Sequence, residues 1–311
     1  MAKQRGFIPV MLTPFEENGR IDYAGLARLT EYYLQCGALG LFANCLSGEM
    51  YDLEEEERRK ILKQVLQTAG GRVPVVATGT FSASPGEQAA CIRQVHDAGA
   101  AATIIITGVV ATAEEPDQVL DARIFDLFRR TEGIPLGFYE CPEPYKRILQ
   151  AEQLKPFLET GRVIYYKDTC LDLSLVKKKL KAAEGRDFGL YDAYAVHAVE
   201  SLRAGAAGLS CIQGNYFPEL ITWLCDNFND KAQQPEVEKV QQFLTRNMEL
   251  MHSGYPATAK YFLQKRGILK NAVTRKKTVA LTVMQKAHID RLFETYRALA
   301  EETGILIPSG E

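Results

Sequence analysis

The sequence predicts a (β/α)8 barrel followed by additional helices. Three observations predict this fold: short apolar runs alternate with stretches of helical periodicity, these runs number eight, and each is apolar throughout instead of alternating with polar residues. Continuous apolar character is typical of parallel strands that are covered on both faces. An open doubly wound sheet is the competing architecture, but it usually has a glycine-rich turn after its first strand, where this chain has Leu12-Thr13-Pro14-Phe15.

The expected strands are joined by helices whose ends are marked by glycine. Gly37, Gly99 and Gly205 each follow a helical stretch and precede small residues, as expected where a helix ends and packs closely on the next strand. Units of this βα type fill residues 1–230, which we expect to form one barrel. The eight strands are expected at 7–12, 39–43, 73–77, 102–106, 134–139, 163–167, 188–191 and 207–212.

Residues 231–311 are expected to form a helical extension that packs on the barrel. Beyond Trp223 the periodicity is helical only. The expected helices are 233–253, 257–266 and 283–302, separated by Gly254-Tyr255-Pro256 and by the basic stretch Arg275-Lys276-Lys277.

Two runs of like charge are expected to have structural roles. Glu54-Glu55-Glu56-Glu57 follows Asp52, a candidate N-cap, so these carboxylates would occupy a first helical turn, where the helix dipole favours them. Lys177-Lys178-Lys179 falls in the middle of a helix and is expected to lie on its solvated face. Neither run predicts a binding site.

Composition and charge argue against nucleic acid and membranes as partners. Of 311 residues, 46% are hydrophobic and 24% are charged, and the formal net charge is −2. Binding to nucleic acid or to an anionic membrane needs a concentrated basic field. No run reaches the roughly 18 apolar residues of a membrane span, and the charged start Met1–Gly6 is not followed by the apolar h-region of a signal peptide. We therefore expect a cytoplasmic protein with a small-molecule partner.

The cysteines and histidines predict neither a metal site nor a redox centre. The seven cysteines contain no C-x-x-C pair, and the four histidines lack the spacing of metal ligands. We expect no metal and no cofactor. Four cysteines fall in or just after expected strands, where they either pack as small apolar side chains, the favoured interpretation, or surround the barrel mouth. These are Cys45, Cys141, Cys170 and Cys211.

In a barrel of this kind the chemistry collects at the C-terminal ends of the strands. Lys167 ends the apolar run 163–166, and Tyr139 ends the preceding strand. Burial lowers the pKa of a lysine, and the neutral amine is the form that attacks a ketone to give an imine. Alone, such a lysine is as often a salt-bridged structural residue, and such a tyrosine is more often a residue at the edge of the core. The pair is a stronger indication than either residue alone.

Short motifs at the strand ends and in the tail carry a family resemblance. They are Thr13-Pro14-Phe15 with Asn18-Gly19, Ser47-Gly48-Glu49, Tyr139 with Pro142, Lys167-Asp168, Gly205 to Gly208 with Asn215, and Ala259-Lys260. In order and spacing these motifs resemble the class I aldolases of the dihydrodipicolinate synthase and N-acetylneuraminate lyase superfamily. The likeness extends over most of the chain.

The resemblance implies a lyase in which Lys167 forms a Schiff base with pyruvate or a related 2-keto acid. Tyr139 would move protons, and the hydroxyl and N–H groups of Ser47 and Gly48 would bind the carboxylate. The imine is an electron sink, so a nearby C–C or C–O bond can break or form through an enamine. The resemblance also implies an aldehyde as second substrate, no cofactor, and a homo-oligomer, either a tetramer or a dimer. The expected pocket further includes Leu46, Val110, Ala193 and Ser210.

Several positions depart from the family's pattern and bear on the substrate. The departures are Leu46 and Val110 for two relay hydroxyls, Pro144 for an arginine, Glu140 for an asparagine, and Ala193 for a common glycine. The arginine holds a second carboxylate in the synthase, and Arg147 or Lys146 lies close enough in sequence to replace it. These changes make 4-hydroxy-tetrahydrodipicolinate synthase activity the less favoured alternative and point to an acceptor that lacks a second carboxylate.

Two interpretations of another class stay open. A non-catalytic keto-acid sensor would keep Lys167 and lose the relay, and turnover of any 2-keto-3-deoxy acid would exclude it. A barrel enzyme of unrelated chemistry, such as a phosphate-binding isomerase, would need glycine-rich loops after the seventh and eighth strands. Gln213-Gly214-Asn215 is only a weak version of such a loop. Aldol cleavage and dehydration of a 2-keto acid both remain compatible with the sequence.

Overall fold

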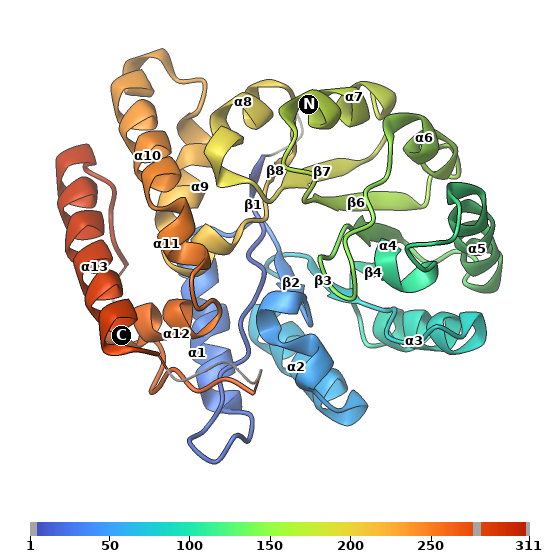
Figure 1. Ribbon diagram of the computed structural model, residues 1–311, viewed down its shortest axis with the longest axis horizontal. Coiled ribbons are helices and arrows are strands. Elements are labelled where there is room, and N and C mark those ends of the chain that lie inside the picture. The colour runs from blue at the N-terminus through green and yellow to red at the C-terminus, as the bar shows by residue number, and fades with distance from the viewer. Residues whose placement is uncertain (1–4, 276–280, 309–311) are drawn as a thin grey trace.

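The computed structural model describes residues 5–275 and 281–308, whose eight parallel strands form the predicted barrel (Figure 1). Each strand pairs with its neighbours in parallel, and the parallel bridge Val10–Phe42 joins the first strand's continuation to the second strand and closes the ring. The Phe42 N–H donates to the Pro9 carbonyl at 3.0 Å across this closure. The strands are β1 (Gly6–Phe7), β2 (Leu41–Ala43), β3 (Val75–Thr78), β4 (Ala102–Ile106), β5 (Leu136–Tyr139), β6 (Val163–Asp168), β7 (Gly189–Asp192) and β8 (Gly208–Leu209).

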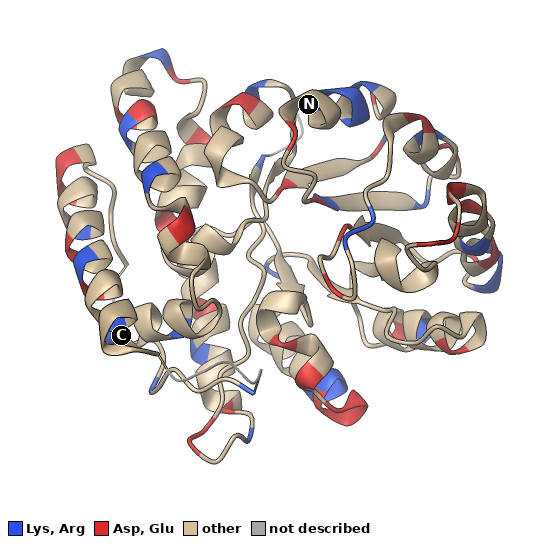
Figure 2. Ribbon diagram, in the orientation of Figure 1, with Lys and Arg blue, Asp and Glu red and all other residues tan. Residues whose placement is uncertain are grey.

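Helices follow the strands and surround the barrel. They are α1 (Tyr23–Gln35), α2 (Glu55–Ala69), α3 (Pro85–Asp97), α4 (Thr107–Val110), α5 (Asp117–Arg130), α6 (Ala151–Glu159), α7 (Leu173–Ala182), α8 (Ala198–Arg203) and α9 (Pro218–Asn227). Gly37, Gly99 and Gly205 have φ angles of 81°, 109° and 109°, as expected of glycines that end a helix. Figure 2 shows that acidic and basic residues are mixed along the outer helices.

The strands alternate between the barrel interior and the layer under the helices. In β4, Ile104 and Ile106 pack with other interior residues, whereas Ile105 packs in the outer layer. The same alternation puts Tyr165 inside and Tyr166 outside. Both faces are therefore buried, which explains why the strands are mostly apolar and do not alternate with polar residues. Eight strands were expected and eight are present, although β1 and β8 are shorter than the apolar runs that predicted them.

The C-terminal helices lie on one side of the barrel, beside α9 and α1 (Figure 1). They are α10 (Gln234–Arg246), α11 (Met248–His252), α12 (Ala257–Lys265) and α13 (Val283–Thr303). The helix expected over 233–253 is divided at Asn247, which lies between α10 and α11. Residues of α9, α10, α12 and α13 share one apolar cluster with α1. The division into a barrel and an extension remains our proposal.

Two sequence-based expectations fall partly outside the described residues, and a third needs correction. Residues 1–4 of the charged start and 276–277 of the basic stretch lie outside the described part of the chain. The N-cap of α2 is Glu54, not Asp52, because Glu54 and Glu57 form a reciprocal capping box. Among residues 5–275 and 281–308, no helix is long and apolar enough to span a membrane.

Candidate active site

Pairing of β5 with β6 brings the two predicted catalytic residues together. Tyr139 and Lys167 are register partners on these adjacent strands. The Lys167 Nζ lies 4.2 Å from the centre of the Tyr139 ring and 5.9 Å from that of Phe42. Tyr139 and Lys167 are each only 3% exposed. The interior of the barrel therefore holds an amine and a phenol side by side at the C-terminal end of the sheet.

Lys167 is a buried amine without a counter-ion. Within the described residues, no carboxylate forms an ion pair with its Nζ and no oxygen accepts a hydrogen bond from it. Burial lowers the pKa of Lys167, an effect that the neighbouring thiols of Cys45 and Cys141 oppose. A lysine in this environment has a larger neutral fraction near neutral pH than a solvated one, and the neutral form is the nucleophile.

Tyr139 is a neutral phenol that faces sulfur in place of the hydroxyl relay. Burial, and then the nearby Cys141 and Cys45 thiols, raise the pKa of Tyr139 well above its ordinary value. The Cys141 thiol is within hydrogen-bonding reach of the phenol, and burial raises its pKa to about 11. Leu46 packs against the interior cluster at the position expected for a relay hydroxyl. The immediate proton-bearing neighbour of Tyr139 is therefore a thiol.

The loop after β2 forms a turn of backbone N–H groups beside Lys167. Ser47 and Gly48 lie in a single 3-10 turn (Leu46–Gly48), and their N–H groups are within reach of the Cys45 thiol. Because this thiol also interacts with Lys167, the turn and the amine border the same space. A side chain at Gly48 would lie 2.9 Å from the Met11 carbonyl, so only glycine fits there. Backbone N–H groups in such a turn are suited to an anion, and of the two the Gly48 N–H also donates to the Cys45 carbonyl at 2.9 Å.

Residues of the C-terminal extension form hydrogen bonds with this turn and with Glu49, which follows it. Glu49 follows the turn with φ of 58° and accepts hydrogen bonds from the Lys260 Nζ at 2.5 Å and from the Arg275 N–H at 2.6 Å. The Ser47 hydroxyl bonds to Tyr255, whose own hydroxyl accepts from Asn215 at 2.6 Å. Burial lowers the pKa of Lys260 to about 8, and the Glu49 carboxylate opposes this shift. Sequence analysis noted Tyr255 only as part of a helix break.

The other predicted pocket residues, Ser210, Ala193 and Val110, lie in three different environments. Ser210 is buried inside the barrel, where its hydroxyl donates to the Ile8 carbonyl at 2.9 Å and lies 3.3 Å from the Tyr165 hydroxyl. Ala193 is half-buried at the end of β7, and its N–H donates to the Asp168 carbonyl. Val110 packs in the outer layer, whereas Val109 packs against the interior cluster. The apolar side chain that α4 contributes to the interior is therefore Val109.

The two cations near Pro144, Arg147 and Lys146, differ in their exposure and in the hydrogen bonds that they already make. The Arg147 guanidinium donates to the carbonyls of Thr112 and Glu115 and to the Asp117 carboxylate, at 2.6, 2.8 and 2.9 Å, and the residue is 8% exposed. Lys146 is exposed, and its Nζ donates to the Thr169 carbonyl at 2.9 Å, two residues after Lys167. The Arg147 guanidinium is therefore bonded to the segment that leads into α5. Of these two cations, it is Lys146 that lies near the end of β6 and is exposed to solvent.

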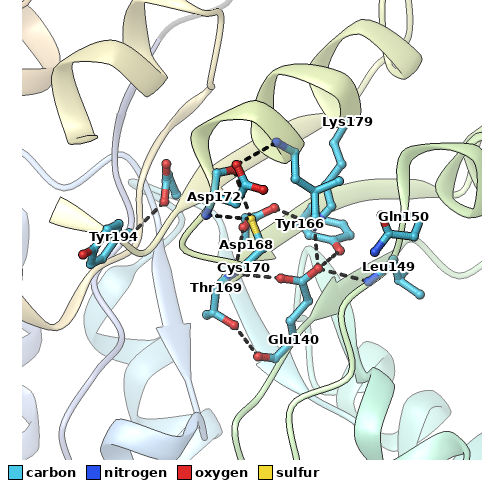
Figure 3. A network of polar contacts seen from close by, with 12 residues as sticks. Glu140, Leu149, Gln150, Tyr166, Asp168, Thr169, Cys170, Asp172, Lys179 and Tyr194 are labelled. Carbon is cyan, nitrogen blue, oxygen red and sulfur yellow. Dashed lines mark hydrogen bonds and ion pairs between the residues drawn. The ribbon is translucent and has the colours of Figure 1, made fainter. Parts of the chain in front are cut away.

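The outer side of the same strands carries a buried charge cluster (Figure 3). The Lys179 Nζ lies 2.5 Å from a Glu140 oxygen and 2.7 Å from an Asp168 oxygen, and all three side chains are fully buried. The expectation of a solvated lysine run is thus confirmed for Lys177 and Lys178, which are exposed, and is wrong for Lys179. Two carboxylates at the ends of β5 and β6 stabilise its charge there.

The four strand-end cysteines differ in which side of the barrel wall they occupy. Cys45, Cys141 and Cys211 are fully buried and interact electrostatically with Lys167, so three of the four strand-end cysteines do surround the site. Cys170 lies on the outer side, where its thiol donates to the Asp172 carbonyl. In the part of the chain that the structure describes, no group of three or more His, Cys, Asp or Glu side chains is arranged to hold a metal ion.

Comparison with known proteins gives concordant matches over nearly the whole chain. The sequence profile of the Dihydrodipicolinate synthetase family matches residues 3–295. A 4-hydroxy-tetrahydrodipicolinate synthase of Pseudomonas aeruginosa is 25% identical over 305 residues, covering 97% of this chain and 99% of its own. That of Cereibacter sphaeroides is 28% identical over 290 residues, covering 92% and 96%.

Solved structures show the same fold. The 4-hydroxy-tetrahydrodipicolinate synthase of Methylacidiphilum fumariolicum superposes with a TM-score of 0.85 at 18% identity, covering 97% of this chain and 99% of the other. The dihydrodipicolinate synthase of Thermotoga maritima gives a TM-score of 0.83 at 20% identity, covering 98% and 100%. The barrel with its C-terminal helices is therefore shared with these proteins.

We predict that Lys260→Met destabilises the protein by about 3–5 kcal/mol, because it removes the buried ammonium group that donates to the Glu49 carboxylate at 2.5 Å. Urea denaturation followed by circular dichroism measures the change. Lys265→Met is the matched control on the same helix, since the Lys265 Nζ pairs with Asp290 at 2.7 Å near the surface. It should cost less than about 1 kcal/mol. Equal losses for both variants would contradict the role given to Lys260.

Proposed function

Because the chain belongs to the Dihydrodipicolinate synthetase family, we propose that it is a lyase that forms a Schiff base between Lys167 and pyruvate or a related 2-keto acid. The observation that carries the proposal is the buried Lys167 amine, which lacks a carboxylate partner and lies beside Tyr139 at the ends of adjacent strands. The names of the relatives support a lyase. Aldol cleavage, condensation and dehydration all proceed through the same enamine.

The keto acid is bound before it reacts. Its carboxylate is proposed to lie on the N–H groups of Ser47 and Gly48 with the Ser47 hydroxyl, next to Lys167. The neutral Nζ attacks the C2 carbonyl carbon, and the carbonyl π electrons move to oxygen. Tyr139 donates its proton to the new alkoxide and takes one from the new ammonium, which gives a neutral carbinolamine and restores the phenol.

Loss of water and formation of the enamine also use Tyr139. The phenol donates its proton to the departing hydroxyl, which leaves as water while the nitrogen lone pair forms the C=N bond. The product is an iminium cation beside a phenolate, and the cation offsets the cost of ionising a phenol whose pKa burial has raised. The phenolate then removes a proton from C3, giving the enamine and a neutral Tyr139. Protons balance over the sequence, and water is the only group released.

The acceptor side of the pocket is proposed to be apolar. Leu46, at a position where the superfamily pattern has a hydroxyl group, and Val109 both pack against the interior residues. Arg147 is held by four oxygen partners away from this space, so it does not supply a fork for a second carboxylate. A dianionic substrate would therefore be desolvated with at most Lys146 to compensate. An aldehyde without a second carboxylate fits this environment better.

Assembly and location follow from the family and stay part of the proposal. Family membership supports a homo-oligomer, either a tetramer or a dimer, that acts in the cytoplasm on small molecules. The non-catalytic sensor is the remaining alternative, since the hydroxyl relay is replaced by Leu46 and the Cys141 thiol. The next two tests separate a binding protein from an enzyme.

Pyruvate with borohydride should leave a reduced three-carbon adduct on Lys167. Because burial lowers the pKa of this lysine from 10.5, trapping at limiting pyruvate should rise with pH and level off below pH 10.5, where the amine is already deprotonated. Peptide mass spectrometry locates the adduct. Lys167→Met should abolish it, and Lys146→Met should not. An adduct on another lysine, or none at saturating pyruvate, would overturn the proposed function.

Tyr139→Phe should still trap pyruvate on Lys167 but lose turnover by about 10²–10⁴-fold, the range for a group that transfers protons. Pyruvate release from a panel of 2-keto-3-deoxy acids, measured by mass spectrometry, reports the rate. Cys141→Ala tests whether the neighbouring thiol shares this role. An unchanged rate in Tyr139→Phe would remove Tyr139 from the mechanism. No turnover of any acid by the unmodified protein would favour the sensor.

An uncharged aldehyde that matches aspartate semialdehyde in length should be a better acceptor for pyruvate than aspartate semialdehyde itself. The reason is that Leu46 and Val109 offer apolar contact and Arg147 is already bonded. Values of kcat/KM for the two aldehydes provide the comparison. A preference of about tenfold or more for the carboxylated aldehyde would contradict the apolar pocket. If Lys146→Met then removed that preference, Lys146 would be the cation that replaces the missing arginine.

A further inference from the structure

A second buried lysine lies on the opposite face of the two strands that carry Tyr139 and Lys167. Lys179 of α7 donates to Glu140 Oε1 at 2.5 Å and to Asp168 Oδ2 at 2.7 Å. None of these three side chains is accessible to solvent. The proposed reaction uses none of them directly.

The positions of the two carboxylates in the sequence give the cluster its significance. Glu140 directly follows Tyr139 on the chain, and Asp168 directly follows Lys167. Successive side chains of an extended segment point to opposite faces. Tyr139 and Lys167 thus face the barrel interior while Glu140 and Asp168 face α7. One ammonium group therefore joins the residues that come next after each of the two proposed catalytic residues.

The hydrogen bonds around the carboxylates make this connection rigid. Glu140 Oε1 also accepts from the Tyr166 hydroxyl at 2.5 Å and from the Leu149 N–H at 3.2 Å, and Oε2 accepts from the Thr169 N–H at 3.0 Å. Figure 3 shows these partners converging on the carboxylate from β6 and from the segments that follow β5 and β6. Each oxygen has a partner, and a fully satisfied buried network holds its members in one arrangement.

Stability alone does not account for such a cluster. Burial raises the pKa of Glu140, and the Asp168 carboxylate adds to this shift. Burial opposes the charge of Lys179, but the two carboxylates outweigh it and raise its pKa. Replacing buried ions by apolar side chains of similar volume is often neutral or stabilising, so their presence points to a need for a defined geometry.

We propose that Lys179 is a positioning residue: by holding Glu140 and Asp168 together, it fixes the ends of β5 and β6 and so sets the Tyr139 phenol against the Lys167 amine. The inference rests on the proposed Schiff-base function. It makes a specific distinction between the two steps of that function. Trapping after equilibration counts the Lys167 residues that have formed the imine, however slowly, whereas the rate of exchange at C3 reports how well Tyr139 is placed for proton transfer.

The test uses pyruvate as the only substrate and the full-length protein. Trapping with borohydride counts the sites at which Lys167 is competent, and NMR in D2O measures exchange of the C3 hydrogens of pyruvate. The rate of exchange at saturating pyruvate is divided by the number of trapped sites. The KM for pyruvate in the exchange reaction is measured as well. The variants are Lys179→Met and, because two unpaired buried carboxylates could prevent folding, the uncharged triple variant Glu140→Gln/Asp168→Asn/Lys179→Met. Lys178→Met, at the exposed neighbouring position on α7, is the matched control.

We expect the triple variant to trap pyruvate on Lys167 while exchange per trapped site falls on the order of 10²-fold, with a much smaller change in KM. Lys178→Met should leave both values unchanged. A merely structural role would lower the number of trapped sites and leave exchange per site within about threefold of the parent, and that result would overturn the proposal. Failure of the unmodified protein to trap pyruvate on Lys167 would instead overturn the proposed function itself.

Discussion

The in-register pairing of β5 with β6 decides which side chains meet at the C-terminal end of this barrel. It aligns Tyr139 with Lys167 inside the barrel, and it also aligns the residues that follow them on the outside. A shift of one residue in either strand would exchange the inner and outer faces, because side chains alternate along a strand. A shift of β6 would put Lys167 under α7 and Asp168 inside the barrel, and a shift of β5 would do the same to Tyr139 and Glu140. The register is thus a condition for every other feature of the site.

Three buried lysines show how local partners set the properties of the same side chain. Lys167 has no carboxylate partner, and burial lowers its pKa. Lys260 has one such partner, and burial still lowers its pKa, to about 8. Lys179 has two, and their charge outweighs burial, so its pKa is raised. The number of carboxylates within reach therefore separates a potential nucleophile from two lysines that hold structure together.

Much of the fold and the centre of the site could be predicted because the relevant signals are local. Strand ends are visible as the last residue of an apolar run, and this is how Lys167 and Tyr139 were identified. Lys179 was assigned to solvent because its neighbours in sequence, Lys177 and Lys178, are exposed, and only the packing of α7 on two distant strand ends buries it. Val109 was missed because α4 is one turn long, too short for its periodicity to be read.

Other parts of the site depend on segments far apart in the sequence. Tyr255 was not predicted because its contact with Ser47 joins residues on opposite ends of the chain through the docking of the C-terminal helices. The same holds for Glu49, whose partners lie in α12 and at Arg275. No pattern within a short window carries that information. Asn215 was part of a motif, but its bonds to Tyr33 and Tyr255 could be assigned only from the structure.

The contacts of Glu49 and Ser47 with the C-terminal extension have a consequence for how the protein is made. The turn that is proposed to bind the carboxylate follows the second strand, but its supports, Tyr255, Lys260 and Arg275, are synthesised after all eight strands. While the ribosome is still adding these residues, the barrel strands are already available to fold. The buried amine can thus exist before the anion site beside it is complete. Competence for substrate therefore arises only after Arg275 has left the ribosome, well after the last strand of the barrel.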